Sequence, residues 1–132
     1  MKDHTDESGR FVTYQNMLIR YLGDKKPHSD NRGDNEDGFQ RSVDLESSCP
    51  GITTICSKAF EWSGFEEIIL PKKLRKIMNN SFDSCLELKY IEIPGKVEYI
   101  GKNAFANCPD LSVDMRTLPM NATIDGTAFE DI

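Results

Sequence analysis

Apolar residues recur from Val43 onward with a regular long period. Four phenylalanines lie 22, 23 and 24 residues apart; each follows a small residue and lies five residues after an isoleucine. The phenylalanines are Phe60, Phe82, Phe105 and Phe129, and the isoleucines are Ile55, Ile77, Ile100 and Ile124. Because several independent positions keep this register, the pattern predicts an internal structural repeat. A period of about 20–29 residues is typical of solenoids whose turns each carry a short strand.

Alternation within each unit predicts a strand with one buried and one exposed face. In the stretch YIEIP, Ile91 and Ile93 point inward, because successive side chains of a strand point to opposite faces. The outward residues of this strand and of the strand one unit earlier are Glu67, Ile69, Tyr90 and Glu92. A proline follows each strand and ends it, since proline cannot continue the hydrogen-bond ladder.

The first 23 residues have a different spacing. Their apolar residues fit the i, i+3, i+4, i+7 and i+8 positions of a helix and are Tyr14, Met17, Leu18, Tyr21 and Leu22. Gly23 suits the end of such a helix. The spacing predicts an N-terminal amphipathic helix within residues 1–23, which either docks on the rest of the chain or folds only with a partner.

The composition then divides the chain into three parts. Residues 24–48 are rich in Gly, Asn, Asp and Ser, which predicts a flexible polar linker. Residues 49–132 contain the repeats and predict a solenoid of about three to four turns of 22–24 residues, with the last turn incomplete. Each unit buries too little apolar surface to fold alone, so stacking of the turns has to supply the core.

The repeat resembles the BspA-type leucine-rich repeat family. The unit reads L-x-x-I-x-I-P-x-x-V-x-x-I-G-x-x-A-F-x-x-C, and its best copy is Leu88 to Cys108. The resemblance covers about residues 50–132, and one unit is a residue short, so that Trp62 or Ser63 takes the cysteine place. It implies a mainly β, leucine-rich-repeat fold and a protein ligand, since related bacterial and protist surface proteins are described as adhesins.

Charge and hydropathy argue against some classes of partner and do not alter the predicted fold. The chain has 132 residues, 29% of them charged, and a formal net charge of −6, which disfavours a nucleic-acid partner. No apolar run approaches the ~20 residues that span a bilayer. The N-terminus has no apolar signal region, which favours the cytoplasm, whereas the family resemblance favours the cell surface.

Two pairs of residues share a repeat position in adjacent units. Cys85 and Cys108 are close enough in the expected stack for a disulfide, but buried free thiols are the favoured interpretation without a signal peptide. Arg75 and Glu98 predict a surface ion pair between turns. We find no catalytic constellation, metal site or cofactor motif in the sequence.

The sequence therefore favours a non-enzymatic protein-binding module. Its expected binding residues are the outward strand residues Glu67, Ile69, Tyr90 and Glu92. The alternative is a structural unit that self-associates through open solenoid ends, or a truncated remnant of a longer repeat protein.

Overall fold

The computed structural model describes residues 4–5, 11–22 and 42–132. Its strands are β1 (His4–Thr5), β2 (Phe11–Tyr14), β3 (Met17–Tyr21), β4 (Ser42–Asp44), β5 (Thr54–Ile55), β6 (Glu67–Ile69), β7 (Lys76–Ile77), β8 (Tyr90–Ile91), β9 (Tyr99–Ile100) and β10 (Thr123–Ile124). A short α-helix, α1, spans Leu45–Ser48, and a 3-10 helix, η1, spans Met115–Thr117. The described chain is mainly β, as the sequence predicts.

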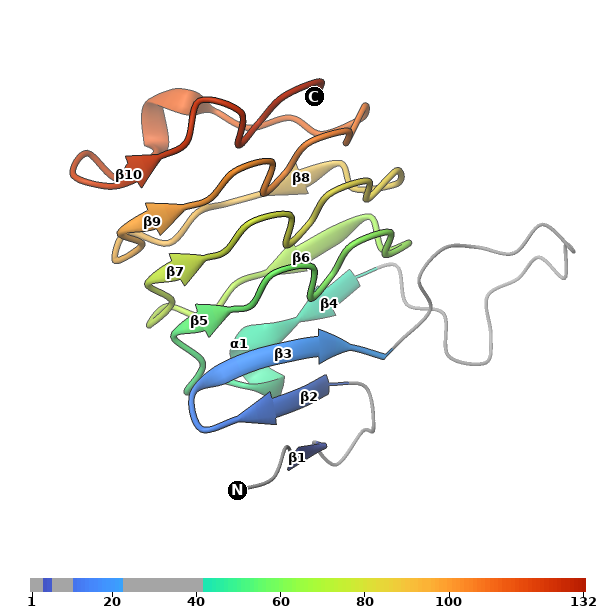
Figure 1. Cartoon of the computed structure of the whole chain (residues 1–132), viewed down its shortest axis with the longest axis vertical. Helices are drawn as coiled ribbons and strands as arrows, with labels where there is room; N and C mark the ends of the chain where they lie inside the picture. The colour runs from blue at the N-terminus through green and yellow to red at the C-terminus, as the bar shows by residue number, and fades with distance from the viewer. Residues whose placement is uncertain (1–3, 6–10, 23–41) are drawn as a thin grey trace, which may run out of the picture.

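From β4 onward the chain coils between two sheets and forms a short solenoid (Figure 1). The long sheet has the strand order β1-β2-β3-β5-β7-β9-β10, and the short sheet has the order β4-β6-β8. Within the solenoid the paired strands are parallel, so successive turns lie directly over one another. Ile55 pairs with Ile77, and Ile77 with Ile100, which confirms the repeat period read from the sequence.

The phenylalanines form a stacked column through the core, as predicted. Ring centroids of Phe60 and Phe82 are 4.9 Å apart, those of Phe82 and Phe105 are 4.9 Å apart, and those of Phe105 and Phe129 are 5.1 Å apart. The planes of neighbouring rings differ by 7° at most. Equal positions in stacked turns lie about one strand spacing apart, roughly 4.8 Å, so the repeat itself sets this ring separation.

The irregular-looking segment around each phenylalanine is also paired between turns. The Phe60 amide donates to the Ser81 carbonyl at 2.8 Å, and the Phe82 amide donates to the Ala104 carbonyl at 2.7 Å. Left-handed backbone, with φ of 55–64°, occurs two positions before and two positions after each of the first three rings, and two positions after the fourth: Lys58, Trp62, Asn80, Ser84, Asn103, Asn107 and Asp131. Because these bends recur at the same positions, each loop has the same backbone path as the loop of the previous turn. Asparagine tolerates left-handed backbone better than most residues do.

The prediction of an N-terminal amphipathic helix is wrong. Residues 11–21 form an antiparallel hairpin of β2 and β3, and β3 pairs in parallel with β5 of the solenoid. The pairing register shifts between Val12 and Thr13, with Ile19 between the two registers on β3. This irregularity lets Leu18 and Tyr21 both face the core although they are three residues apart. The i, i+3 spacing that suggested a helix therefore arises from an irregular strand.

The hairpin covers the N-terminal end of the solenoid and extends the ring column. Tyr21 lies 5.2 Å from Phe60 between ring centroids, and Phe11 lies 5.4 Å from Tyr21. The Tyr21 amide donates to the Ala59 carbonyl at 2.9 Å, in the same way as the amides of Phe60, Phe82 and Phe105 donate to the turn that follows each of them. A solenoid requires such a cap, because its first turn would otherwise expose core side chains and unpaired backbone groups.

The predicted linker is also too long at its C-terminal end. Residues 42–48 form β4 and α1, and Val43 and Leu45 are buried. Asp44 is the N-cap that precedes α1, and its carboxylate accepts a hydrogen bond from the Ser47 amide at 3.1 Å. The remaining predicted linker, residues 24–41, lies outside the described residues. The first strand of the short sheet thus comes from a segment whose polar composition concealed it.

The two cysteines at the shared repeat position are fully buried, and no disulfide joins them. Cys85 donates to the Phe60 carbonyl at 3.1 Å, and Cys108 donates to the Phe82 carbonyl at 3.2 Å, so each thiol ties its turn to the previous one. A hydrogen bond with Cys85 lowers the pKa of Cys108. Ser63, not Trp62, takes the cysteine place in the short unit, and its hydroxyl is buried without a partner among the described residues.

The predicted ion pair between Arg75 and Glu98 is confirmed. The Nε atom of Arg75 lies 2.9 Å from Oε2 of Glu98, and both side chains are about half exposed. An exposed pair of this kind contributes about 0–1 kcal/mol to the free energy of unfolding, so it adds little to the stability of the stacked turns.

Candidate functional site

The four expected binding residues lie together on the outward side of the short sheet. We call this surface, made of Glu67, Ile69, Tyr90 and Glu92, the strand face. Glu67 of β6 pairs with Tyr90 of β8, so their side chains are neighbours across the two strands. Glu92 follows β8 and is exposed, two residues beyond Tyr90. Alternation along a strand therefore placed all four side chains correctly on one surface.

The strand face combines exposed apolar groups with a buried support. Tyr90 is 56% exposed and Ile69 is 47% exposed. Ile68 lies between the two outward residues of β6, and Ile91 lies between Tyr90 and Glu92. Both point into the core and are buried. Their packing against the solenoid core fixes the backbone that carries Tyr90 and Ile69, so the outward side chains sit on a rigid layer.

Residues that the sequence analysis did not single out extend the strand face in both directions. Ser42 pairs with Glu67, and Asp44 pairs with Ile69, so β4 adds two polar residues at the N-terminal side. Ser112 forms a parallel bridge with Tyr90 on the C-terminal side. The stretch SVDL from Ser42 repeats the alternation of EIIL and YIEI, and this signal could have revealed β4.

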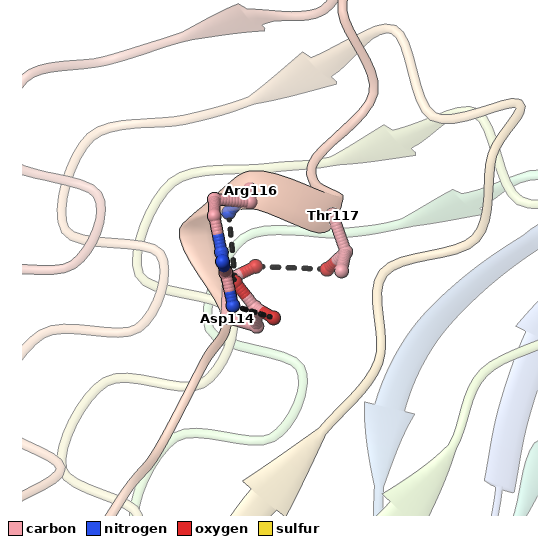
Figure 2. A network of polar contacts seen from close by, with 3 residues as sticks. All are labelled: Asp114, Arg116 and Thr117. Atoms are coloured by element: carbon pink, nitrogen blue, oxygen red, sulfur yellow. Dashed lines mark hydrogen bonds and ion pairs between the residues drawn. The ribbon is translucent and has the colours of Figure 1, made fainter.

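The strand face is acidic. Glu67 and Glu92 are exposed, and neither makes an ion pair with any residue that the structure describes. Asp114, two residues beyond Ser112, accepts hydrogen bonds from the Arg116 guanidinium, with Nε 3.1 Å from Oδ1, and from the Arg116 amide (Figure 2). These hydrogen bonds from Arg116 lower the pKa of Asp114. The Asp114 carboxylate is paired with the Arg116 guanidinium, so it adds no uncompensated charge beside the strand face.

The outward side of the long sheet is less apolar and more basic. Lys76 pairs with Thr54 on one side and with Tyr99 on the other. Tyr99 is half-buried, and its hydroxyl lies 3.4 Å from Oδ1 of Asn79. Among the residues of this surface whose burial the structure describes, no aromatic ring is as exposed as that of Tyr90, which makes the surface a suitable control for the strand face.

Among the described residues, no group of three or more His, Cys, Asp or Glu side chains is placed so that it could hold a metal ion. Within the same residues, no helix is both long and apolar enough to cross a membrane.

The chain was compared with known proteins. The family described as "BspA type Leucine rich repeat region (6 copies)" matches residues 38–132. This match begins shortly before β4 and agrees with the earlier start of the solenoid in the structure. No curated protein and no solved structure gave a significant match. Repeats of this family are typical of protein-interaction modules without catalytic activity. Since the family matches well over half of its length, the chain belongs to the BspA-type leucine-rich repeat family.

Proposed function

We propose that the chain is a non-enzymatic protein-binding module whose strand face contacts the partner. The observation that carries the proposal is the exposure of Tyr90 and Ile69 above a buried layer. Ile69 lies diagonally across the two strands from Tyr90, whose paired neighbour is Glu67, and diagonal neighbours on a sheet are within reach of an aromatic side chain. Neighbouring exposed apolar side chains mark an interaction surface more often than isolated ones do. An adhesin-like role is the form of binding that the family resemblance implies, and it belongs to this proposal.

The physical argument rests on the low cost of ordering this surface. Binding normally consumes free energy because interface side chains and loops lose freedom, by about 0.5–1.5 kcal/mol for each flexible side chain. The Tyr90 side chain has two rotatable bonds, and its backbone is already fixed in the sheet. Tyrosine is also enriched among the residues that dominate binding energies. Tyr90 is therefore the expected anchor of the interface.

Replacing Tyr90 with alanine is expected to weaken partner binding by about tenfold or more. The measurement is affinity capture from extracts of cells that encode the chain, with the captured proteins quantified for the wild type and for each variant. The matched control is Tyr99→Ala, which removes the same ring from the outward side of the long sheet. Proteins that are captured equally by both variants and by the wild type would contradict binding through the strand face.

A second candidate function is self-association through the C-terminal turn. Among the described residues β10 pairs with β9 alone, and the Phe129 ring stacks on the Phe105 ring from one side. The N-terminal end is instead covered by the β2–β3 hairpin. Unpaired strand edges favour pairing with a second strand. We therefore propose that, if copies of the chain assemble, they meet through β10 and the residues beyond it.

Light scattering after size-exclusion chromatography tests this second candidate. Ile132→Asp places a charge beyond β10, where Ile132 is 36% exposed, and it is expected to return an assembled chain to the monomer. Leu86→Asp is the matched control, because Leu86 is 37% exposed but lies in the middle of the solenoid. A wild-type chain that stays monomeric at all concentrations, or equal effects of the two variants, would rule this candidate out.

A further inference from the structure

We propose that the strand face binds a protein segment that presents lysine or arginine side chains. This inference rests on the function proposed above and adds the chemistry of the partner. The argument is charge complementarity between an exposed sheet face and its occupant, together with the position of the one exposed aromatic ring on that face.

Exposed carboxylates recur turn by turn along this side of the solenoid. Asp44 belongs to β4, Glu67 to β6, and Glu92 directly follows β8. Asp114 lies two residues beyond Ser112, which forms the bridge with Tyr90. The strand register places Asp44 opposite Ile69 and Glu67 opposite Tyr90, so the carboxylates of successive turns alternate between two positions along the strands. Turns about 4.8 Å apart and strand positions about 7 Å apart keep these carboxylates within reach of one extended segment. Such a group of carboxylates repels nucleic acid and attracts a basic peptide.

The negative charge of the strand face is largely uncompensated by the described part of the chain. Glu67 and Glu92 have no ion pair there, and Asp44 accepts hydrogen bonds from Ser47 rather than from a cation. The exceptions are Arg116, which holds Asp114, and Lys89, whose Nζ lies 4.0 Å from Oε1 of Glu66. The main basic cluster lies elsewhere, in the loop after β6 and at the first residue of β7: Lys72, Lys73, Arg75 and Lys76.

Tyr90 gives the strand face a second means of holding a cation. It is flanked by Glu67 on the neighbouring strand and by Glu92 two residues further along its own strand. A guanidinium or ammonium group over the exposed ring would gain a cation–π contact and lie near both carboxylates. Two copies of the chain meeting through this face would instead bring like charges together, which disfavours a second copy as the occupant.

Titration of the full chain with two short synthetic peptides tests the inference. One peptide alternates arginine with valine and the other alternates glutamate with valine, and binding is followed by amide chemical shifts in NMR spectra. We expect the arginine peptide alone to bind, with shifts at Ile69 and Tyr90, and with an affinity that falls as salt is raised. The double variant Glu67→Gln/Glu92→Gln is expected to bind it about fivefold more weakly.

The control double variant is Glu87→Gln/Glu130→Gln. It removes the same charge at two exposed residues outside the strand face, and we expect it to retain the wild-type affinity within about twofold. Equal weakening by the two double variants would show general charge attraction and overturn the inference, as would absence of binding or equal binding of both peptides. A partner whose capture needs Tyr90 but tolerates Glu67→Gln/Glu92→Gln would overturn the basic segment while leaving the proposed function intact.

Discussion

Replacing Phe82 with alanine is expected to lower the free energy of unfolding by about 3–5 kcal/mol. Phe82 is fully buried, and its ring stacks between those of Phe60 and Phe105 at 4.9 Å on either side. The substitution therefore opens a cavity in the middle of the column and removes two ring contacts at once. The measurement is denaturant unfolding followed by circular dichroism and by the fluorescence of Trp62, the single tryptophan of the chain.

The matched control for this variant is Phe129→Ala at the end of the same column. Phe129 is half-buried and stacks on one ring, Phe105, so its loss should cost less than about 2 kcal/mol. Equal costs at the two positions would contradict a continuous column whose centre carries more of the stability than its end.

Replacing Tyr21 with alanine is expected to cost about 3–5 kcal/mol, whereas Leu22→Ala should cost less than about 1 kcal/mol. Tyr21 is buried against Phe11 and Phe60 in the hairpin, and Leu22 is 50% exposed just beyond β3. Loss of the Tyr21 ring uncovers the first turn of the solenoid, so the effect should reach the whole fold. The same unfolding experiment measures both variants.

This pair of variants separates the hairpin from the helix that the spacing suggested. In an amphipathic helix Tyr21 and Leu22 would lie on the same apolar side, and their losses would cost similar amounts. Comparable destabilisation by the two substitutions would therefore argue against the hairpin cap.

The repeated part of the fold could be predicted from the sequence because identical spacing leaves little freedom. Once Ile55, Ile77 and Ile100 are in register, the phenylalanines five residues later have to lie over one another. The outward position of Glu67 and Tyr90 follows from the same strands by alternation. The sequence therefore sufficed to predict the family, the architecture and the ring column. It also sufficed to predict that the four strand-face residues point outward.

The N-terminal hairpin could not be predicted because it does not repeat. An irregularity in the β2–β3 register lets Leu18 and Tyr21, which are three residues apart, face the same side. Spacing in a single sequence cannot distinguish this arrangement from a helical turn. β4 was missed for a different reason. Its buried residue Val43 stands between Ser42 and Asp44, in a segment whose polar composition outweighed one short alternation. The partner of the strand face is a property of a second molecule and stays a prediction.

The most direct test of the account is an NMR measurement of contacts between phenylalanine rings in selectively labelled protein. Stacked turns predict cross-peaks that connect Phe60 to Phe82, Phe82 to Phe105, and Phe105 to Phe129, with none between Phe60 and Phe129. Rings that contact one another out of this order, or that show no mutual contacts, would contradict the stacked solenoid and the rigid strand face built on it.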